Sequence, residues 1–405
     1  MMENNNYNTK WYSLATVFFG GIVSVPALLI GSSLIGSLRF ETAITAGFIG
    51  FTLVVFFMSL VSIAGVEKRK SSVSLAASGF GKTGARIIVG FVVGMSTLGW
   101  FGIQSNIAGA SFAEIVRETW EIQIPVWISS VFWGMIMSLS GVFGFKLLRW
   151  LNYIAVPAII LLLIYGLFLV FQEHDFVEVL SYVPESEMTL IQAIGLTIGF
   201  ISVAIVIAPD YNRFAATKRD AVLGTLLGVL PSAFPLLGIG ALLAITQETH
   251  NIVKIFSDFG FPLFAMTILI LATWTSNVMN IYSSGLAFTM MFDLRSITRS
   301  RVTLIVSIVG LILAAIGILE HFMGFIGLLT TTVTPVAGVI IADHFLVKRK
   351  NNEEKAFNWR GTVSWGSGVL IMFVMDLSVK YMLGIVVSAL VYYALSASIK
   401  SGHSE

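Results

Sequence analysis

The sequence predicts an all-α, polytopic membrane protein with twelve transmembrane helices. The first observation is a scarcity of charge, since Asp, Glu, Lys and Arg make up 11% of the 405 residues, against roughly 25% in a soluble domain. The second is a hydrophobic fraction of 56% with a mean hydropathy of +0.89, which is more apolar surface than one globular core can bury. The third is the arrangement of the apolar residues in long runs. A soluble enzyme is therefore excluded.

Twelve apolar runs follow one another along the chain, each bounded by charged or turn residues. About 20 apolar residues in a helix cross a bilayer, so these runs have the length of single spans. In order, they cover residues 14–36, 42–66, 87–113, 125–145, 151–171, 191–209, 221–245, 261–292, 302–319, 325–347, 362–379 and 382–399. They predict one transmembrane domain over residues 14–399, between tails at 1–13 and 400–405.

Most of the basic residues lie in alternate loops of the predicted topology. Only Arg39, Arg117, Lys254 and Lys380 fall on one side of the predicted membrane, and the other 20 of the 24 fall on the side of the two termini. Because Lys and Arg gather in cytoplasmic loops, both termini are predicted in the cytoplasm and the protein in the cell membrane. The first run is longer than a signal-peptide core and lacks a cleavage pattern, so we expect it to remain as a span.

The first run has helix-weakening residues near its middle. Gly20, Gly21, Ser24 and Pro26 lie there, and backbone groups freed inside a membrane must find protein, water or a ligand. The pattern favours a helix broken at mid-depth. The alternative is a proline kink packed tightly against a neighbouring helix.

The third and sixth runs carry candidate ligand-binding residues. Ser96, Trp100 and Gln104 follow at spacings of four and share one helix face. A mid-depth Trp with an amide one turn away suits a planar ligand, and the alternative is a core Trp with a Gln bonded to a neighbouring helix. In the sixth run Phe200 and Ser202 follow a Gly195–Gly199 pair, which ordinarily permits close helix packing. Phe200 is a candidate for the second face of an aromatic stack.

The eighth run concentrates polar residues. Thr273, Trp274, Thr275, Ser276, Asn277, Asn280, Ser283 and Ser284 lie near its centre. They predict a hydroxyl and amide stripe facing the protein interior, and the alternative is hydroxyls bonded back to their own helix. The carboxylates Asp210 and Asp343 lie at span ends and Asp376 lies in the eleventh run, so a proton relay is poorly supported. A monovalent cation held by the Thr275 and Ser276 hydroxyls and by carbonyls of the broken first run fits better.

Several enzyme motifs are incomplete or absent. Gly79, Gly81 and Gly84 match GxGxxG, but no strand precedes them and they lie in a cytoplasmic connection, where an amphipathic helix is predicted instead. The histidines lack HExxH spacing, no GxSxG occurs, and the chain has no cysteine. No catalytic residue or organic cofactor is predicted. The basic inner loops complement anionic lipid rather than nucleic acid.

Four segments carry a family resemblance. They are Gly99-Trp100-Phe101-Gly102, Phe200-Ile201-Ser202 with the later Asp210 and Arg213-Phe214, Trp274-Thr275-Ser276-Asn277, and Pro335 with Gly338-Val339-Ile340-Ile341-Ala342-Asp343. In order and spacing the chain resembles the nucleobase:cation symporter-1 family, and especially its cytosine permease branch. The resemblance implies a LeuT-like fold, with inverted repeats over about 14–171 and 191–347 and two extra helices over 362–399.

The resemblance also implies the site. The substrate would stack between Trp100 and Phe200, with Ser96, Gln104, Ser202, Ala272 and Asn277 around it. Sodium would lie between first-span carbonyls, at Gly21, Ser24 and Val25, and the hydroxyls of Thr275 and Ser276.

At two positions the sequence departs from the pattern of the cytosine permeases, and both positions bear on the choice of substrate. Ala272 stands where cytosine permeases have Asn, and Gln104 stands where they have Gly but where the family's hydantoin transporter has Gln. Since a buried polar mismatch costs about 1 to 3 kcal/mol, we expect cytosine to be a poor substrate. A purine, another pyrimidine or a hydroxymethylpyrimidine-like compound remains open.

The sequence thus predicts a monomeric, sodium-coupled importer of a small planar heterocycle that works by alternating access. A proton-coupled or uncoupled permease of the same fold is the alternative. A channel is disfavoured because no span is polar along its full length, and a receptor because no soluble output domain is present.

Overall fold

Helices account for all twelve apolar runs in the part of the chain that the structure describes. The computed structural model describes residues 7–143, 145–173, 176–184, 186–258, 262–294, 297–347, 356–375 and 380–397. The helices that match the runs are α1 (Trp11–Ile22) with α2 (Val25–Ile35), α3 (Phe40–Lys68), α5 (Lys82–Trp120), α6 (Val126–Phe143), α7 (Phe145–Glu173), α9 (Leu190–Asn212), α10 (Lys218–Thr246), α12 (Pro262–Met291), α13 (Arg299–Ala315), α14 (Phe322–Ile341), α15 (Trp359–Val374) and α16 (Lys380–Ala397). Shorter pieces connect them: α4 (Ser72–Phe80), α8 (Phe176–Ser181), α11 (Ile252–Ser257), the 3-10 turn η1 (Ile318–His321) and the π-helical η2 (Ala342–Val347).

The described helices establish a multi-pass membrane protein. Six helical stretches are long and apolar enough to span a bilayer: α3, α5, α9, α10, α12 and the η1–α14–η2 stretch. The bent pair α1 and α2 counts as a seventh if taken as one span. For α6, α7, α13, α15 and α16, crossing of the membrane stays a prediction.

The first span is broken as predicted. Between α1 and α2, Val23 and Ser24 leave the helical conformation, with Ser24 extended at φ −156° and ψ 162°. The two halves meet at an angle of 59°. Pro26 lies in the first turn of α2, where its missing N–H costs no helical hydrogen bond. The residues thus form a full break rather than a kink.

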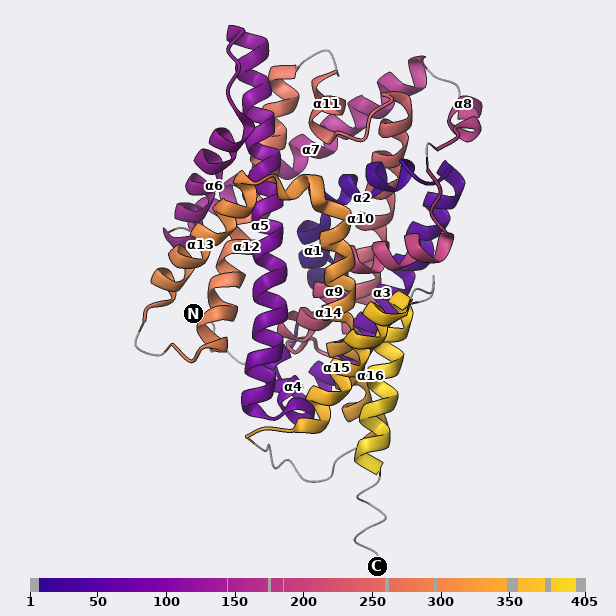
Figure 1. Ribbon diagram of the computed structural model, residues 1–405, viewed down its shortest axis with the longest axis vertical. Coiled ribbons are helices and arrows are strands. Elements are labelled where there is room, and N and C mark those ends of the chain that lie inside the picture. The colour runs from indigo at the N-terminus through magenta and orange to yellow at the C-terminus, as the bar shows by residue number, and fades with distance from the viewer. Residues whose placement is uncertain are drawn as a thin grey trace, which may run out of the picture.

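The long axis of the molecule follows α5. Its 39 residues extend about 58 Å at 1.5 Å per residue, and the helix runs along most of Figure 1. The short helix α4 lies at one end of the molecule, whereas α8 and α11 lie at the other (Figure 1). Near α4, the segment before α1 is held by the α9–α10 connection, since Thr9 N donates to Phe214 O (3.0 Å) and Ala216 N donates to Thr9 O (2.9 Å).

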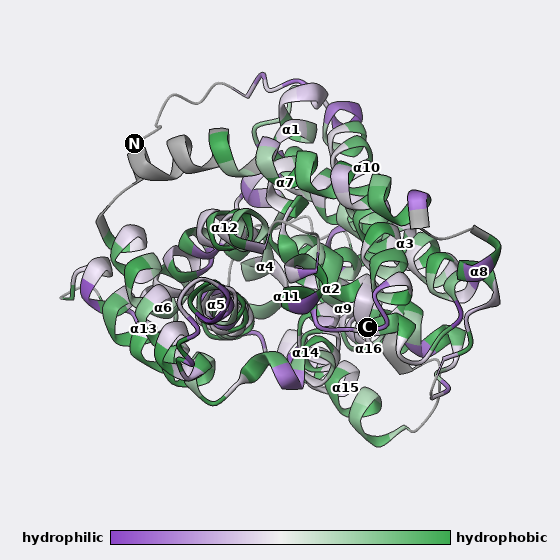
Figure 2. Ribbon diagram, turned by 90° about the horizontal axis from the view of Figure 1, so that it is seen from above, coloured by the Kyte–Doolittle hydropathy of each residue, from purple (hydrophilic) through white to green (hydrophobic). Residues whose placement is uncertain are grey.

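Apolar side chains also cover the periphery. Figure 2 shows α6 and α13 at one edge of the molecule, coloured mainly as hydrophobic. Phe132 on α6 and Ile305 and Ile308 on α13 are between 48% and 60% exposed. Exposed apolar residues in such number suit hydrocarbon rather than water, which agrees with a membrane environment.

The glycine-rich connection has a packing role. The predicted helix forms as α4, but Leu75, Ala76 and Phe80 on it are buried rather than lying on a surface. The backbone of the segment before α15 covers it, since Asn358 N donates to Phe80 O at 2.8 Å. Gly81 turns the chain at φ +79°, and a Cβ there would lie 2.7 Å from Asn358 N.

We therefore expect Gly81→Ala to destabilise the protein. At φ +79° and ψ 162° the backbone of Gly81 lies in a region that almost only glycine adopts, which costs a residue with a Cβ about 1 to 3 kcal/mol. The contact with the Asn358 backbone adds to that cost. A lower melting temperature of the purified protein would show the effect. Gly366→Ala on α15 is the matched control, because no atom beyond its chain neighbours and its own helix backbone lies within 4 Å of its added Cβ. Equal melting temperatures for the two variants would refute the prediction.

Candidate functional site

The break in the first span leaves backbone carbonyl groups without helical partners. Phe19 O still accepts from Val23 N at 3.0 Å, and Ile22 O accepts from the Ser24 hydroxyl at 3.2 Å. The Gly20 and Gly21 carbonyls accept no backbone hydrogen bond from the described residues. Since α2 contacts α12, the break and the polar helix belong to neighbouring elements. Carbonyl oxygens in this position suit a hard cation.

Four aromatic side chains meet beside α5 and form what we call the aromatic cluster: Trp100, Phe200, Phe322 and Phe325. The ring of Trp100 lies 5.6 Å from Phe200, 6.0 Å from Phe322 and 5.5 Å from Phe325, each edge to face. The predicted pair therefore comes together. Phe322 and Phe325 carried no sequence signal, because Phe occurs 31 times in the chain.

The predicted stack is not formed by Trp100 and Phe200 in this arrangement. Their planes meet at 81°, whereas a flat ligand between two rings needs them parallel and roughly 7 Å apart, twice the carbon contact distance of about 3.5 Å. At 5.6 Å between centroids, the two side chains fill each other's space. Binding of a planar ligand between them requires one ring to turn.

Close packing of two helices fixes the position of Phe200. Thr330 on α14 donates to Gly195 O at 3.2 Å, and a Cβ on Gly199 would lie 1.9 Å from the Thr330 hydroxyl oxygen. The glycine pair thus serves close helix approach, the ordinary role of such residues in membranes. Phe200 follows directly and is held near α14.

Five of the polar residues predicted on α12 fall into two sets, and a sixth, Trp274, donates from Nε1 to the Ser140 hydroxyl on α6 at 3.2 Å. Thr273 donates to Leu269 O and Ile270 O within its own helix, and Thr275 donates to Ala272 O at 2.8 Å. These two hydroxyls are bonded back to their own helix, which is the alternative that the sequence left open.

The second set reaches α5. Ser276 donates to Gln104 Oε1, and Ser284 donates to Gly94 O at 2.9 Å. Asn277 donates from Nδ2 to Phe101 O (3.1 Å). These contacts explain why α5 and α12 pack along each other, and they place Asn277 against the α5 backbone.

The remaining candidate residues are buried and bonded locally. Ser96 donates to Val92 O at 2.5 Å and Ser202 donates to Gly199 O at 2.8 Å, both within their own helices. Ala272 is buried, and its carbonyl oxygen accepts from the Thr275 hydroxyl at 2.8 Å. Their contacts with a substrate stay predictions.

The carboxylates at the span ends are engaged with protein groups. Asp210 at the end of α9 accepts from Ser72 N at 2.9 Å, and Asp343 accepts from the Tyr392 hydroxyl at 2.6 Å. Asp376 lies outside the described residues.

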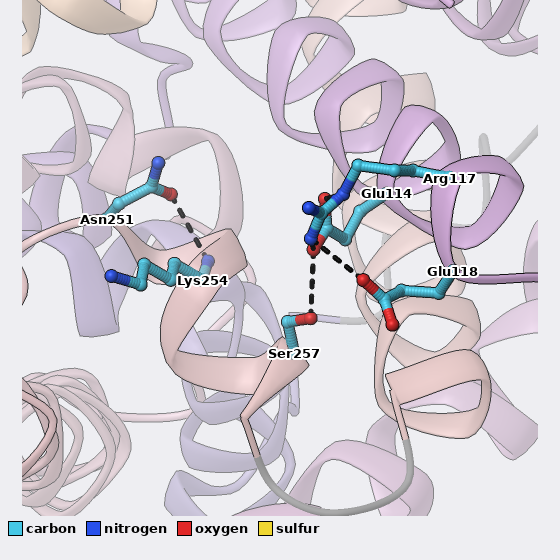
Figure 3. A network of polar contacts seen from close by, with 6 residues as sticks. All are labelled: Glu114, Arg117, Glu118, Asn251, Lys254 and Ser257. Atoms are coloured by element: carbon cyan, nitrogen blue, oxygen red, sulfur yellow. Dashed lines mark hydrogen bonds and ion pairs between the residues drawn. The ribbon is translucent and has the colours of Figure 1, made fainter. Parts of the chain in front are cut away.

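At the end of the molecule opposite α4, a polar network connects α11 to α5 (Figure 3). The Ser257 hydroxyl donates to Glu114 at 3.0 Å, and Arg117 pairs with Glu114 (2.5 Å) and with Glu118 (2.8 Å). The adjoining His250 Nδ1 lies 3.1 Å from Ser32 O on α2. The α10–α12 connection is thereby attached to both α5 and the second half of the broken span.

A family model described as permease for cytosine/purines, uracil, thiamine, allantoin matches residues 2–396. Among curated proteins, a hydantoin permease of Microbacterium maritypicum is 26% identical over 92% of this chain and 81% of its own length. A cytosine permease of Escherichia coli K12 is 28% identical over 87% of this chain and 82% of its own length.

The fold also has solved counterparts. The inward facing conformation of Mhp1 superimposes with a TM-score of 0.86 over 99% of this chain and 95% of that chain, at 19% sequence identity. The arrangement of helices is therefore shared along nearly the whole length of both chains.

Proposed function

This chain belongs to the family of permeases for cytosine/purines, uracil, thiamine and allantoin, and on that premise we propose that it imports a planar heterocycle together with sodium. The resemblance seen in the sequence is confirmed, and the protein is a membrane transporter rather than an enzyme. The heterocycle and the coupling ion are the proposed parts.

One observation carries the proposal: a broken helix contacts the hydroxyl-bearing α12, and α12 is bonded to the helix of Trp100. The break offers backbone carbonyls, and Thr275 and Ser276 offer hydroxyl oxygens. Neutral oxygens of this kind hold a hard monovalent cation without a carboxylate. The aromatic cluster supplies flat apolar faces, and Gln104 supplies an amide. Gly21, Ser24 and Val25 are the proposed first-span ligands.

We propose the topology on the same grounds. Twelve spans would place both termini in the cytoplasm, with inverted repeats over 14–171 and 191–347 and two further helices over 362–399. Alternating access then takes place around a site near mid-membrane. A single copy of the chain contains all of these residues, and we propose that the monomer transports.

Coupling follows from linkage. A cation that fastens α1 and α2 to α12 also orders Ser276, and through it the helix of Trp100. Any increase that sodium causes in substrate affinity must be matched by an equal increase that substrate causes in sodium affinity.

Counterflow in proteoliposomes tests the proposal. Vesicles preloaded with an unlabelled nucleobase should accumulate the same labelled base transiently, because only a carrier exchanges substrate. External sodium replacing choline should increase the initial rate. A rate independent of sodium would favour a proton-coupled or uncoupled permease, and the absence of exchange for purines, pyrimidines and hydantoin would contradict the proposed substrate class.

A thermal-shift panel provides the complementary measurement. A ligand that binds only the folded protein stabilises it by about 2.7 kcal/mol at 100 times its dissociation constant. We expect a nucleobase to raise the melting temperature more in sodium than in choline. Equal shifts in the two salts would contradict coupling through binding.

A further inference from the structure

The hydrogen bond between Ser276 and Gln104 joins the proposed cation site to the proposed substrate site. Ser276 lies beside Thr275 on α12, and Gln104 lies one turn beyond Trp100 on α5. Gln104 is 3% exposed, and its Oε1 accepts from the Ser276 hydroxyl. The Gln104 side chain makes no other hydrogen bond within the described part of the chain, so Nε2 donates to no described protein group.

A hydroxyl has one proton and two lone pairs. The Ser276 oxygen lies 3.2 Å from Ala272 O and 3.4 Å from Thr273 O, both farther away than Gln104 Oε1. The proton therefore points to Gln104. The lone pairs of the Ser276 oxygen are therefore left for a cation. A cation bound there disfavours the opposite orientation of Gln104, in which the amide N–H would point toward the Ser276 oxygen.

The orientation of Gln104 decides what the amide offers a ligand. A carboxamide has one acceptor oxygen and one NH₂ donor group. When Ser276 occupies the oxygen, only the donors remain. Asn277 differs, because its Nδ2 donors are directed to Phe101 O and Ser105. Gln104 thus keeps its donors for a ligand beside Trp100.

We propose that Ser276 is a positioning residue that fixes Gln104 as a hydrogen-bond donor, so that the site selects heterocycles presenting a ring carbonyl over those presenting an amino group. The inference rests on the proposed function. A ring with an amino group toward Gln104 places donor against donor in a buried position, and sites built to pair one polar group strongly reject the mismatched analogue.

Matched pairs of bases test the inference. Hypoxanthine has an oxo group and a protonated ring nitrogen where adenine has an amino group and an unprotonated one, and adenine has no carbonyl. Uracil and cytosine differ in the same way at C4 and N3, and both keep the carbonyl at C2. With the purified full-length protein in sodium, we expect the oxo member of each pair to bind at least about tenfold more tightly, measured by titrated thermal shift. Equal or tighter binding of the amino members would overturn the inference.

Variants separate positioning from packing. Ser276→Ala frees Gln104 to turn, and the preference should fall to within about threefold, whereas Ser276→Thr keeps the hydroxyl and should restore it. Thr273→Ala is the matched control, because the Thr273 hydroxyl bonds only to Leu269 O and Ile270 O of its own helix; its oxo-to-amino ratio should equal that of the wild type. An unchanged ratio in Ser276→Ala would overturn the inference.

Failure of the inference and failure of the proposed function give different results. If bases bind and undergo counterflow with the wrong preference, the inference alone is overturned. If uracil, cytosine, hypoxanthine, adenine and hydantoin all fail to bind and to exchange, the proposed function is overturned and the inference with it.

Discussion

Trp100→Ala is expected to abolish uptake of the transported heterocycle. Trp100 lies at the centre of the aromatic cluster, with three Phe rings within 6.0 Å of its own. A base stacked on an aromatic side chain gains about 1 to 3 kcal/mol, which corresponds to roughly 5- to 150-fold in affinity at 1.4 kcal/mol per factor of ten. Sodium-driven uptake into cells or proteoliposomes measures the loss.

The same variant has a packing cost that must be separated from binding. Truncation of a large aromatic side chain in a core costs about 3 to 5 kcal/mol of stability. Trp100→Leu keeps apolar bulk without a flat face and should also lose binding, whereas Trp100→Phe keeps a face and should retain transport within about tenfold. If Trp100→Leu binds substrate as tightly as the wild type, stacking on Trp100 is wrong.

Trp133→Leu on α6 is the matched control for packing. Trp133 also contacts three aromatic rings, Phe112, Phe132 and Trp274, at 5.7 to 5.8 Å. Its cluster shares no residue with that of Trp100. We expect a comparable loss of melting temperature but persistent uptake. Loss of uptake in both Leu variants at equal expression would attribute the effect to general destabilisation.

The sequence predicted those features that depend on local composition. Hydropathy located the helices, and the grouping of Gly20, Gly21, Ser24 and Pro26 located the break, because Gly and Pro disfavour a helix interior and Ser competes for backbone hydrogen bonds there. The stripe on α12 was visible for the same reason, since helical periodicity alone puts its polar residues on shared faces.

Features that depend on packing between helices were not predictable. The bond from Ser276 to Gln104 requires the register of α12 on α5, which no local pattern encodes. The edge-to-face arrangement of Trp100 and Phe200 depends on how α14 presents Phe322 and Phe325. The burial of α4 depends on residues nearly 280 positions further along the chain, such as Asn358, which donates to Gly79 O at 2.6 Å. An amphipathic surface helix and a covered helix have the same sequence signature.

Thr275→Val is expected to weaken sodium activation by at least about tenfold, since the loss of one interaction with a charge costs about 1.5 to 3 kcal/mol. The substitution keeps the β-branched shape and removes only the hydroxyl oxygen, whose proton is donated to Ala272 O and whose lone pairs remain for a cation. The half-saturating sodium concentration for uptake should rise, while the rate at saturating sodium changes little. Linkage requires substrate affinity at low sodium to fall as well.

Thr273→Val is the control for Thr275→Val, because it makes the same chemical change two residues earlier on α12. Thr273 is fully buried, and its hydroxyl bonds only to Leu269 O and Ile270 O of its own helix. It should leave the sodium dependence as in the wild type, whereas Thr275→Ser should preserve the proposed ligand oxygen. If Thr275→Val and Thr273→Val give the same half-saturating sodium concentration, the hydroxyl of Thr275 holds no coupling ion. Sodium must then act elsewhere or not at all.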